Sequence, residues 1–86
     1  SARQFGPWAV KKTDGTVENM LKRWGQDAGW RVLSKGAPTV EIHGDAEVDR
    51  REFLHAADYA ITQAKQAGYR IKATAYSNNV LVLTGE

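Results

Sequence analysis

Two stretches of the chain carry hydrophobic residues at steps of three and four, which is the spacing of a helix with one apolar face. The first stretch lies between Thr16, a good N-cap residue, and Gly29, which suits a left-handed position after a helix. Its apolar positions are Val17, Met20, Leu21, Trp24 and Ala28. The pattern predicts a helix of about three turns over 17–28.

The second stretch is rich in alanine. Asp49, with Glu52 three residues later, has the arrangement of a capping box, so we expect a helix that is capped there and ends at Gly68. Its inward positions are Phe53, Ala57, Ala60, Ile61 and Ala64, with Leu54 at the border. A face of small residues lets bulky side chains approach closely, and Trp24 and Trp30 are the expected partners.

Short strands are predicted over 8–10, 30–33, 39–43, 69–76 and 80–84. Apolar and polar residues alternate in 39–43 and 69–76, whereas 80–84 is apolar on both faces. Residues 44–49 are expected to form a turn-rich loop, and 77–79 a tight turn. The order β-α-β-β-α-β-β predicts an α+β sandwich with two helices packed on small mixed or antiparallel sheets. We expect 1–7 to be a linker or remnant and 8–86 to be a single domain.

Trp24 and Trp30 admit two interpretations. Exposed indoles form stacking platforms for bases or glycan rings, whereas buried indoles anchor a core. Trp24 shares its helical stripe with Leu21, and Trp30 shares a strand face with Val32, so packing is favoured. The expected structural core comprises Val17, Leu21, Trp24, Trp30, Val32, Phe53, Ile61 and Ile71.

Composition narrows the classes of site that are expected. The chain has 86 residues and no cysteine, which excludes disulfides, thiolate zinc sites and cysteine nucleophiles. Its formal net charge is +2, and its basic residues are scattered rather than clustered, which disfavours nucleic-acid binding. No stretch is long and apolar enough for a membrane span, and the fragment has no secretory leader pattern.

Several motifs resemble a known family. They are Gly15-Thr16-Val17, the Leu21–Trp24 stretch, Ala28-Gly29-Trp30-Arg31-Val32 and the closing Tyr76-Ser77-Asn78-Asn79-Val80 hairpin. Together with the order of elements, they resemble the C-terminal domain family of toxin-coregulated pilus biosynthesis protein Q, over about 8–83. This family is similar to the N0 domain of secretins and to the signalling domain of TonB-dependent receptors.

The resemblance implies a periplasmic, non-enzymatic interaction domain of an envelope-spanning machine. The machine would be a type IV pilus, a secretin-associated apparatus or a conjugative type IV secretion system. Its partners would be secretin, pilus or secretion-channel subunits, with ring-like self-association as a further expectation. The parent protein would be associated with the outer membrane, in some relatives as a lipoprotein.

Two surfaces are candidates for partner binding. Trp8 and Val10 lie on a short terminal strand, where an exposed edge invites pairing by another chain; packing of Trp8 over the sheet edge is the alternative. Arg70, Lys72 and Tyr76 lie on one face of the strand before the closing hairpin. A basic face with an aromatic tip suits an acidic partner, although an ordinary solvated sheet face has the same pattern.

Catalytic and metal sites are not expected. The only cluster with metal-ligand chemistry consists of His43, Asp45, Glu47, Glu52, His55 and Asp58, and its spacing is loose. The sequence has no nucleophile motif and no glycine-rich phosphate loop, so we expect no cofactor, no small-molecule substrate and no enzymatic activity.

Two other functions stay open at this point. A peptidoglycan-binding domain needs exposed aromatic rings in a groove, so Trp8 and Tyr76 would have to converge. A nucleic-acid-binding sheet needs exposed aromatics in the middle of its strands, and only Tyr76 resembles one.

Overall fold

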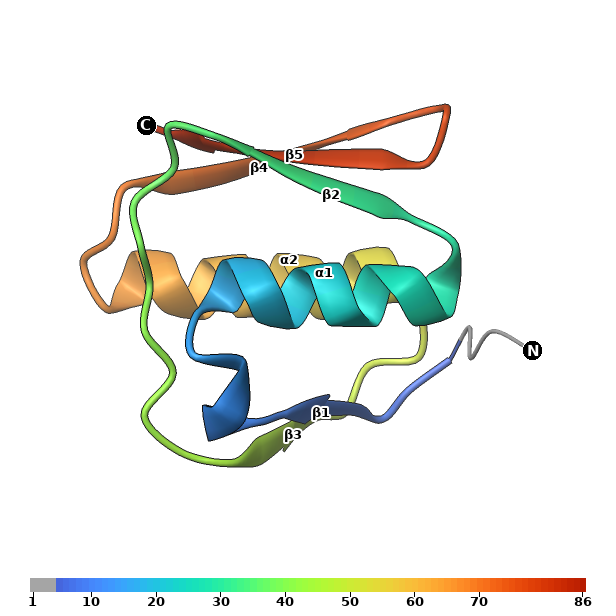
Figure 1. The fold of residues 1–86 in the computed structure, drawn as a ribbon, viewed down its shortest axis with the longest axis horizontal. Coiled ribbons are helices and arrows are strands. Elements are labelled where there is room, and N and C mark those ends of the chain that lie inside the picture. Colours follow the sequence, from blue (N-terminus) through green and yellow to red (C-terminus); the bar gives the residue numbers. More distant parts are fainter. Residues whose placement is uncertain (1–4) are drawn as a thin grey trace.

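The computed structural model describes residues 5–86 and contains two helices between two small sheets (Figure 1). The elements follow in the order β1 (Trp8–Val10), the 3-10 turn η1 (Lys12–Asp14), α1 (Val17–Ala28), β2 (Arg31–Lys35), β3 (Ala46–Val48), α2 (Phe53–Gln66), β4 (Ile71–Tyr76) and β5 (Val80–Gly85). The α+β sandwich and the order of its elements are therefore confirmed. Neither helix has the length and apolar character of a bilayer-spanning helix within the described residues.

The larger sheet has the strand order β2-β5-β4. β5 pairs in parallel with β2 on one side and antiparallel with β4 on the other. The smaller sheet pairs β1 with β3 in antiparallel fashion. Figure 1 shows α1 and α2 side by side between these two sheets, so one face of each sheet covers the helices and the other faces outward.

The core is entirely apolar. It combines the inward stripes of both helices with alternate residues of the strands, namely Trp8, Val17, Met20, Leu21, Trp24, Val32, Val40, Val48, Phe53, Ala56, Ala57, Ala60, Ile61, Ala64, Ile71, Leu81 and Leu83. Seven of the eight predicted core residues are in this set. The eighth, Trp30, is only half-buried and packs against the edge of the core.

The first helix has the predicted ends. The Thr16 hydroxyl accepts a hydrogen bond from the Asn19 backbone N–H at 3.2 Å, and Gly29 adopts a left-handed conformation with φ of 79°. The tight turn before β5 is also confirmed, because Asn79 has a positive φ of 61°. Its carbonyl accepts from the Arg31 N–H at 2.9 Å, which ties the hairpin to the start of β2.

The position of the third strand was predicted wrongly. Residues 39–43 form no strand, although Val40 and Ile42 do point inward as their alternation suggests. The Val17 N–H donates to the Val40 carbonyl and the Ile42 N–H to that of Gly15, so this segment is held by the start of α1. The strand is Ala46–Val48, inside the predicted loop, because β1 pairs there.

The start of the second helix was also misplaced. α2 begins at Phe53 with Glu52 as its N-cap, and no side chain caps it. The Gly6 N–H donates to the Arg51 carbonyl at 2.9 Å, and Phe5 forms an antiparallel bridge with Glu52. This pairing engages Arg51 and keeps the Glu52 backbone extended, so the helix cannot start at the predicted Asp49 box. It also attaches residues 5–7 of the predicted linker to the fold, whereas 1–4 lie outside the described residues.

Candidate protein-interaction surfaces

The outward face of the larger sheet is built from three aligned rows of side chains. Leu81 and Leu83 of β5 are buried against the helices, so the alternate residues of that strand point outward. The register with β2 and β4 completes the rows: Arg31–Val80–Tyr76, Leu33–Val82–Thr74 and Lys35–Thr84–Lys72. We call these nine residues the outer face, and in Figure 1 neither the two helices nor the smaller sheet of residues 5–86 lies over it.

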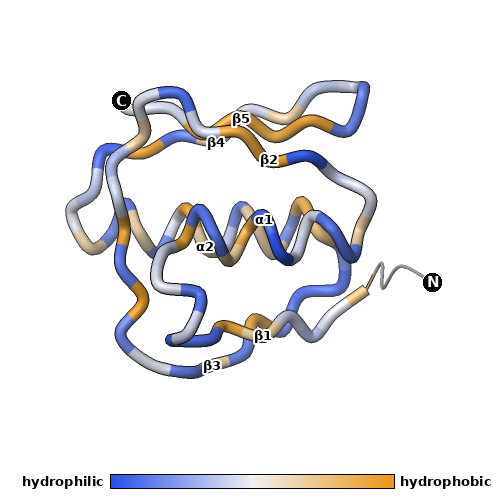
Figure 2. Tube along the Cα trace, viewed as in Figure 1, coloured by the Kyte–Doolittle hydropathy of each residue, from blue (hydrophilic) through white to orange (hydrophobic). Residues whose placement is uncertain are grey.

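The middle of the outer face is apolar and its borders are basic. Leu33, Val80 and Val82 are half-buried, and Figure 2 shows the hydrophobic colour running along β5. Arg31, Lys35 and Lys72 are exposed on the two flanking strands, and none of the three forms an ion pair with a described residue. Tyr76 is 53% exposed at one end. The face can therefore offer apolar area together with three free cations.

The predicted residues Lys72 and Tyr76 lie on the outer face, as their alternation in β4 suggests. Arg70 is exposed just before β4, and its carbonyl accepts from the Glu86 N–H at 3.0 Å. The carboxylate of Glu86 points to Lys65 of α2, at 3.5 Å, so it does not neutralise the cations of the face. Their use in partner binding stays a prediction.

The other predicted surface, around Trp8, is different from what we expected. The Trp8 side chain is 2% exposed, because it packs against Trp24 and Phe53 with ring centroids 5.7 and 6.0 Å apart. Its indole is thus part of the core and is not available to a partner. Val10 is half-buried and pairs with Ala46 of β3.

The backbone of β1 is also engaged at its middle residue. The Ala9 carbonyl accepts hydrogen bonds from Trp24 Nε1 at 2.8 Å and from Arg23 Nη2 at 2.6 Å. Arg23 also pairs with Asp14, which lowers the pKa of that carboxyl and raises that of the guanidinium, chiefly through their side-chain hydrogen bonds. Because this carbonyl already has two donors, β1 is a poor site for the addition of a partner strand.

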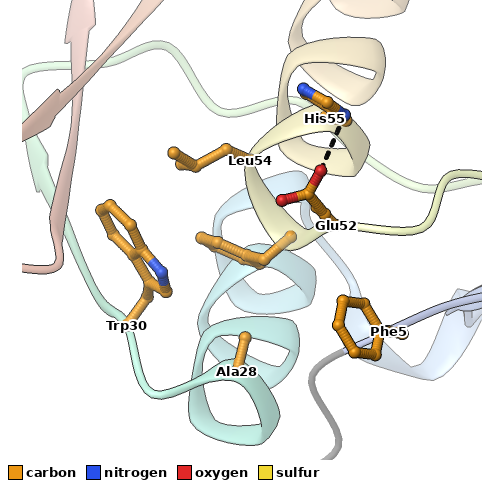
Figure 3. Close-up of a pocket in the computed structure, with 7 residues that line it drawn as sticks. Phe5, Ala28, Trp30, Glu52, Leu54 and His55 are labelled. Atoms are coloured by element: carbon orange, nitrogen blue, oxygen red, sulfur yellow. Dashed lines mark ion pairs between the residues drawn. The ribbon is translucent and has the colours of Figure 1, made fainter.

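A hollow of about 400 Å³ opens where the end of α1 meets the start of α2 (Figure 3). Phe5 and Trp30 stand on opposite sides of it, and its other apolar lining residues are Ala28, Phe53 and Leu54. Trp30 packs against Phe53 with centroids 5.7 Å apart. Two of the three exposed large hydrophobic residues of the described chain, Phe5 and Leu54, thus gather here.

One rim of this hollow is polar. His55 Nδ1 lies 3.7 Å from Glu52 Oε1, and both side chains are well exposed. Asp45 of the predicted metal-like cluster is engaged elsewhere, because it accepts a hydrogen bond from the Lys12 N–H at 2.8 Å. Among residues 5–86, no three His, Asp or Glu side chains come together as metal ligands.

The sequence alone missed the three residues that β2 contributes to the outer face. Arg31, Leu33 and Lys35 belong to a strand that is nearly forty residues away from β4, and only the parallel pairing of β2 with β5 brings them beside Lys72 and Tyr76. The one available signal was β5 itself, whose run of apolar residues is typical of a strand covered on both faces.

Comparison with known proteins agrees with the motifs and the fold. Searches of curated proteins and of solved structures returned no match. The model of one family, described as toxin co-regulated pilus biosynthesis protein Q, matches residues 7–86 and thus spans all the helices and strands. The chain belongs to the family of toxin co-regulated pilus biosynthesis protein Q, a family of pilus-biosynthesis components.

Proposed function

We propose that this domain is a periplasmic protein-interaction module of a pilus machine, and that it helps to assemble or stabilise the outer-membrane complex of that machine. The observation that carries the proposal is the family match over residues 7–86. The domain would act by binding neighbouring subunits through its surface and would have no enzymatic activity. Secretin-associated and conjugative secretion machines are further settings in which the same module would work.

The distribution of polar groups supports this reading. The buried cluster contains only apolar residues, and the titratable pair with shifted pKa values, Asp14 and Arg23, is satisfied internally. Catalytic acids and bases are usually titratable groups perturbed within a pocket, whereas this pair fixes the 3-10 turn to α1. The features that remain for function are surfaces: the outer face and the hollow beside Trp30.

The peptidoglycan alternative loses its basis. It required the rings of Trp8 and Tyr76 to meet in a groove, but Trp8 is buried between the smaller sheet and the helices, and Tyr76 lies on the outward side of the other sheet. The nucleic-acid alternative is weak for a related reason, since Tyr76 is the one aromatic ring on the outer face and lies at a strand end.

Affinity purification from the envelope tests the proposal. A tagged copy of the chain, directed to the periplasm of piliated cells, should enrich pilus-assembly proteins over a copy carrying Leu21→Asp, which places a charge at a fully buried position and should unfold the domain. Equal recovery by the two copies, or enrichment of no pilus component, would argue against the function. Sedimentation with purified sacculi and gel shifts with DNA at low salt should both be negative.

A further inference from the structure

The centre of the outer face has the composition of a covered surface. When one face of a sheet meets water, its strands normally alternate apolar-in and polar-out. β5 departs from this rule, because Val80 and Val82 point outward while Leu81 and Leu83 point inward. Leu33 of β2 lies beside Val82 and extends the apolar area across two strands. The sequence thus provides an apolar surface on the side of the sheet that neither α1 nor α2 covers.

The charges around this surface have one sign. β2, β4 and β5 together contain no aspartate or glutamate before Glu86, whereas Arg31, Lys35 and Lys72 are exposed on them. Arg31 and Lys35 lie on one edge strand, about 13 Å apart along it, and Lys72 lies on the other, about 10 Å across the sheet from Lys35. The cations therefore flank the apolar centre on both sides.

We propose that the outer face binds an acidic amphipathic helix of a partner protein, which rests on the proposed function. The width of three strands, about 10 Å between the outer two, is close to the diameter of one helix. A helix lying over β5 would place its apolar stripe on Val82 and Leu33. Its flanking carboxylates would then reach Arg31 and Lys35 on one side and Lys72 on the other.

Other occupants fit this surface less well. A second copy docked face to face would bring three cations against three cations, which costs energy in a contact that excludes water. RNA-binding sheets stack bases on aromatic rings in mid-strand, where this face has Val82, Leu33 and Thr74. On a lipid surface, the long basic side chains would contact the headgroups first, and the half-buried aliphatic residues between them would remain uncovered.

Titration with a synthetic helix tests the proposal. The probe is a 14-residue peptide with leucine at helical a and d positions and glutamate flanking them, added to the ¹⁵N-labelled 86-residue chain. We expect saturable shift changes at Leu33, Thr74 and Val82, with affinity falling at least about fivefold between 0.05 and 0.5 M NaCl. A peptide with lysine in place of glutamate, and one with serine in place of leucine, should not bind this face.

Charge-matched variants locate the interaction. The double substitution Lys35→Gln/Lys72→Gln should lower the affinity for the glutamate peptide by about three- to tenfold, as expected for the loss of two partly exposed ion pairs. Lys11→Gln/Lys12→Gln removes the same charge from exposed positions around η1 and should change the affinity less than about twofold. Leu33→Thr/Val82→Thr should abolish binding while circular dichroism stays unchanged.

Several results would overturn the inference. One is that the NMR shift changes are confined to another surface. Another is that both lysine-to-glutamine double variants lower the peptide affinity equally. A third is that this face binds phosphatidylglycerol vesicles or oligouridine more tightly than it binds the peptide. If the peptide does not bind while the tagged chain still enriches pilus components, the outer face does not bind such a helix and the proposed function is unaffected. Loss of that enrichment would instead remove the function itself.

Discussion

The carboxylate of Asp14 and the guanidinium of Arg23 form a two-point ion pair. Arg23 Nε lies 2.8 Å from Asp14 Oδ1, and Nη2 lies 2.7 Å from Oδ2. The same Nη2 donates to the Ala9 carbonyl at 2.6 Å. One side chain of α1 thus joins the helix to both the 3-10 turn and β1. Because the smaller sheet has only two short strands, we expect this junction to matter for its attachment.

The first prediction concerns the strength of this pair. Asp14→Asn should lower the free energy of unfolding by about 1–2 kcal/mol, since hydrogen bonds to charged groups contribute more than neutral ones and Asp14 is largely shielded from water. Glu18→Gln is the control, because it breaks the exposed Lys22–Glu18 pair and should cost at most about 0.5 kcal/mol. Urea denaturation at neutral pH measures both. Equal losses in the two variants would show that the partly buried Asp14–Arg23 pair stabilises the domain no more than the exposed Lys22–Glu18 pair does.

The pair should also make stability depend on pH. The hydrogen bonds of Arg23 lower the pKa of Asp14 below its ordinary value of 3.8. Its contribution to stability is therefore complete above that value and is lost as the pH falls through the lowered pKa of the folded state. The gap in unfolding free energy between the wild type and Asp14→Asn should shrink between pH 6 and pH 2.5. A constant gap would contradict this origin of the stabilisation.

Gly25 provides a prediction in which two effects oppose each other. Alanine is the better helix former by about 1 kcal/mol, so Gly25→Ala in the last turn of α1 should stabilise an isolated helix. However, an added Cβ would lie 2.7 Å from the Trp30 carbonyl oxygen and 3.2 Å from Val32 Cγ2. Because the first contact is with backbone, α1 and β2 must separate, and we expect a net loss of about 1–3 kcal/mol.

Gly44 serves as the control for that substitution. No heavy atom lies within 4 Å of a Cβ built there, and its φ is not in the left-handed region. Gly44→Ala should therefore be neutral or stabilise the domain by up to about 1 kcal/mol through the unfolded chain. In thermal unfolding, Gly25→Ala should lower the midpoint, whereas Gly44→Ala should leave it unchanged or raise it. A shift in the same direction would mean that the contact at Gly25 relaxes easily.

The three tryptophans should differ in their access to solvent. Trp8 and Trp24 are 2% and 1% exposed, whereas Trp30 is half-buried beside the 400 Å³ hollow. Iodide should quench part of the native fluorescence, and Trp30→Phe should remove most of the quenchable fraction. Trp24→Phe should leave that fraction in place. Quenching that survives Trp30→Phe would mean that the core around Trp8 and Trp24 is open to solvent.

How far the sequence predicts the fold depends on whether the deciding contacts are local. The ends of α1 follow from Thr16 and Gly29, which act on their own helix, and the turn before β5 follows from Asn79. The start of α2 does not follow from local residues, because pairing with Phe5 and Gly6 overrides the capping pattern of Asp49 and Glu52. Long-range pairing thus decides between local alternatives.

The same reasoning explains what could be predicted of the candidate site. Alternation in β4 places Lys72 and Tyr76 on one face without knowledge of the fold. The contribution of Arg31 and Lys35 depends on the strand order β2-β5-β4, which no local pattern specifies. Trp8 was misjudged for a related reason: few apolar residues surround it in sequence, but the fold brings Trp24 and Phe53 against it.

Photo-cross-linking in piliated cells tests most directly whether the domain works by holding a neighbouring subunit on its outer face. A photoreactive phenylalanine would replace Thr74, in the middle row of that face beside Val82, or, as a control, the exposed Thr13 in η1. Position 74, but not position 13, should form an adduct with a pilus-assembly protein, and the attached peptide should be an acidic amphipathic helix. Adducts of equal yield from both positions, or no adduct with any pilus component, would contradict this role of the outer face.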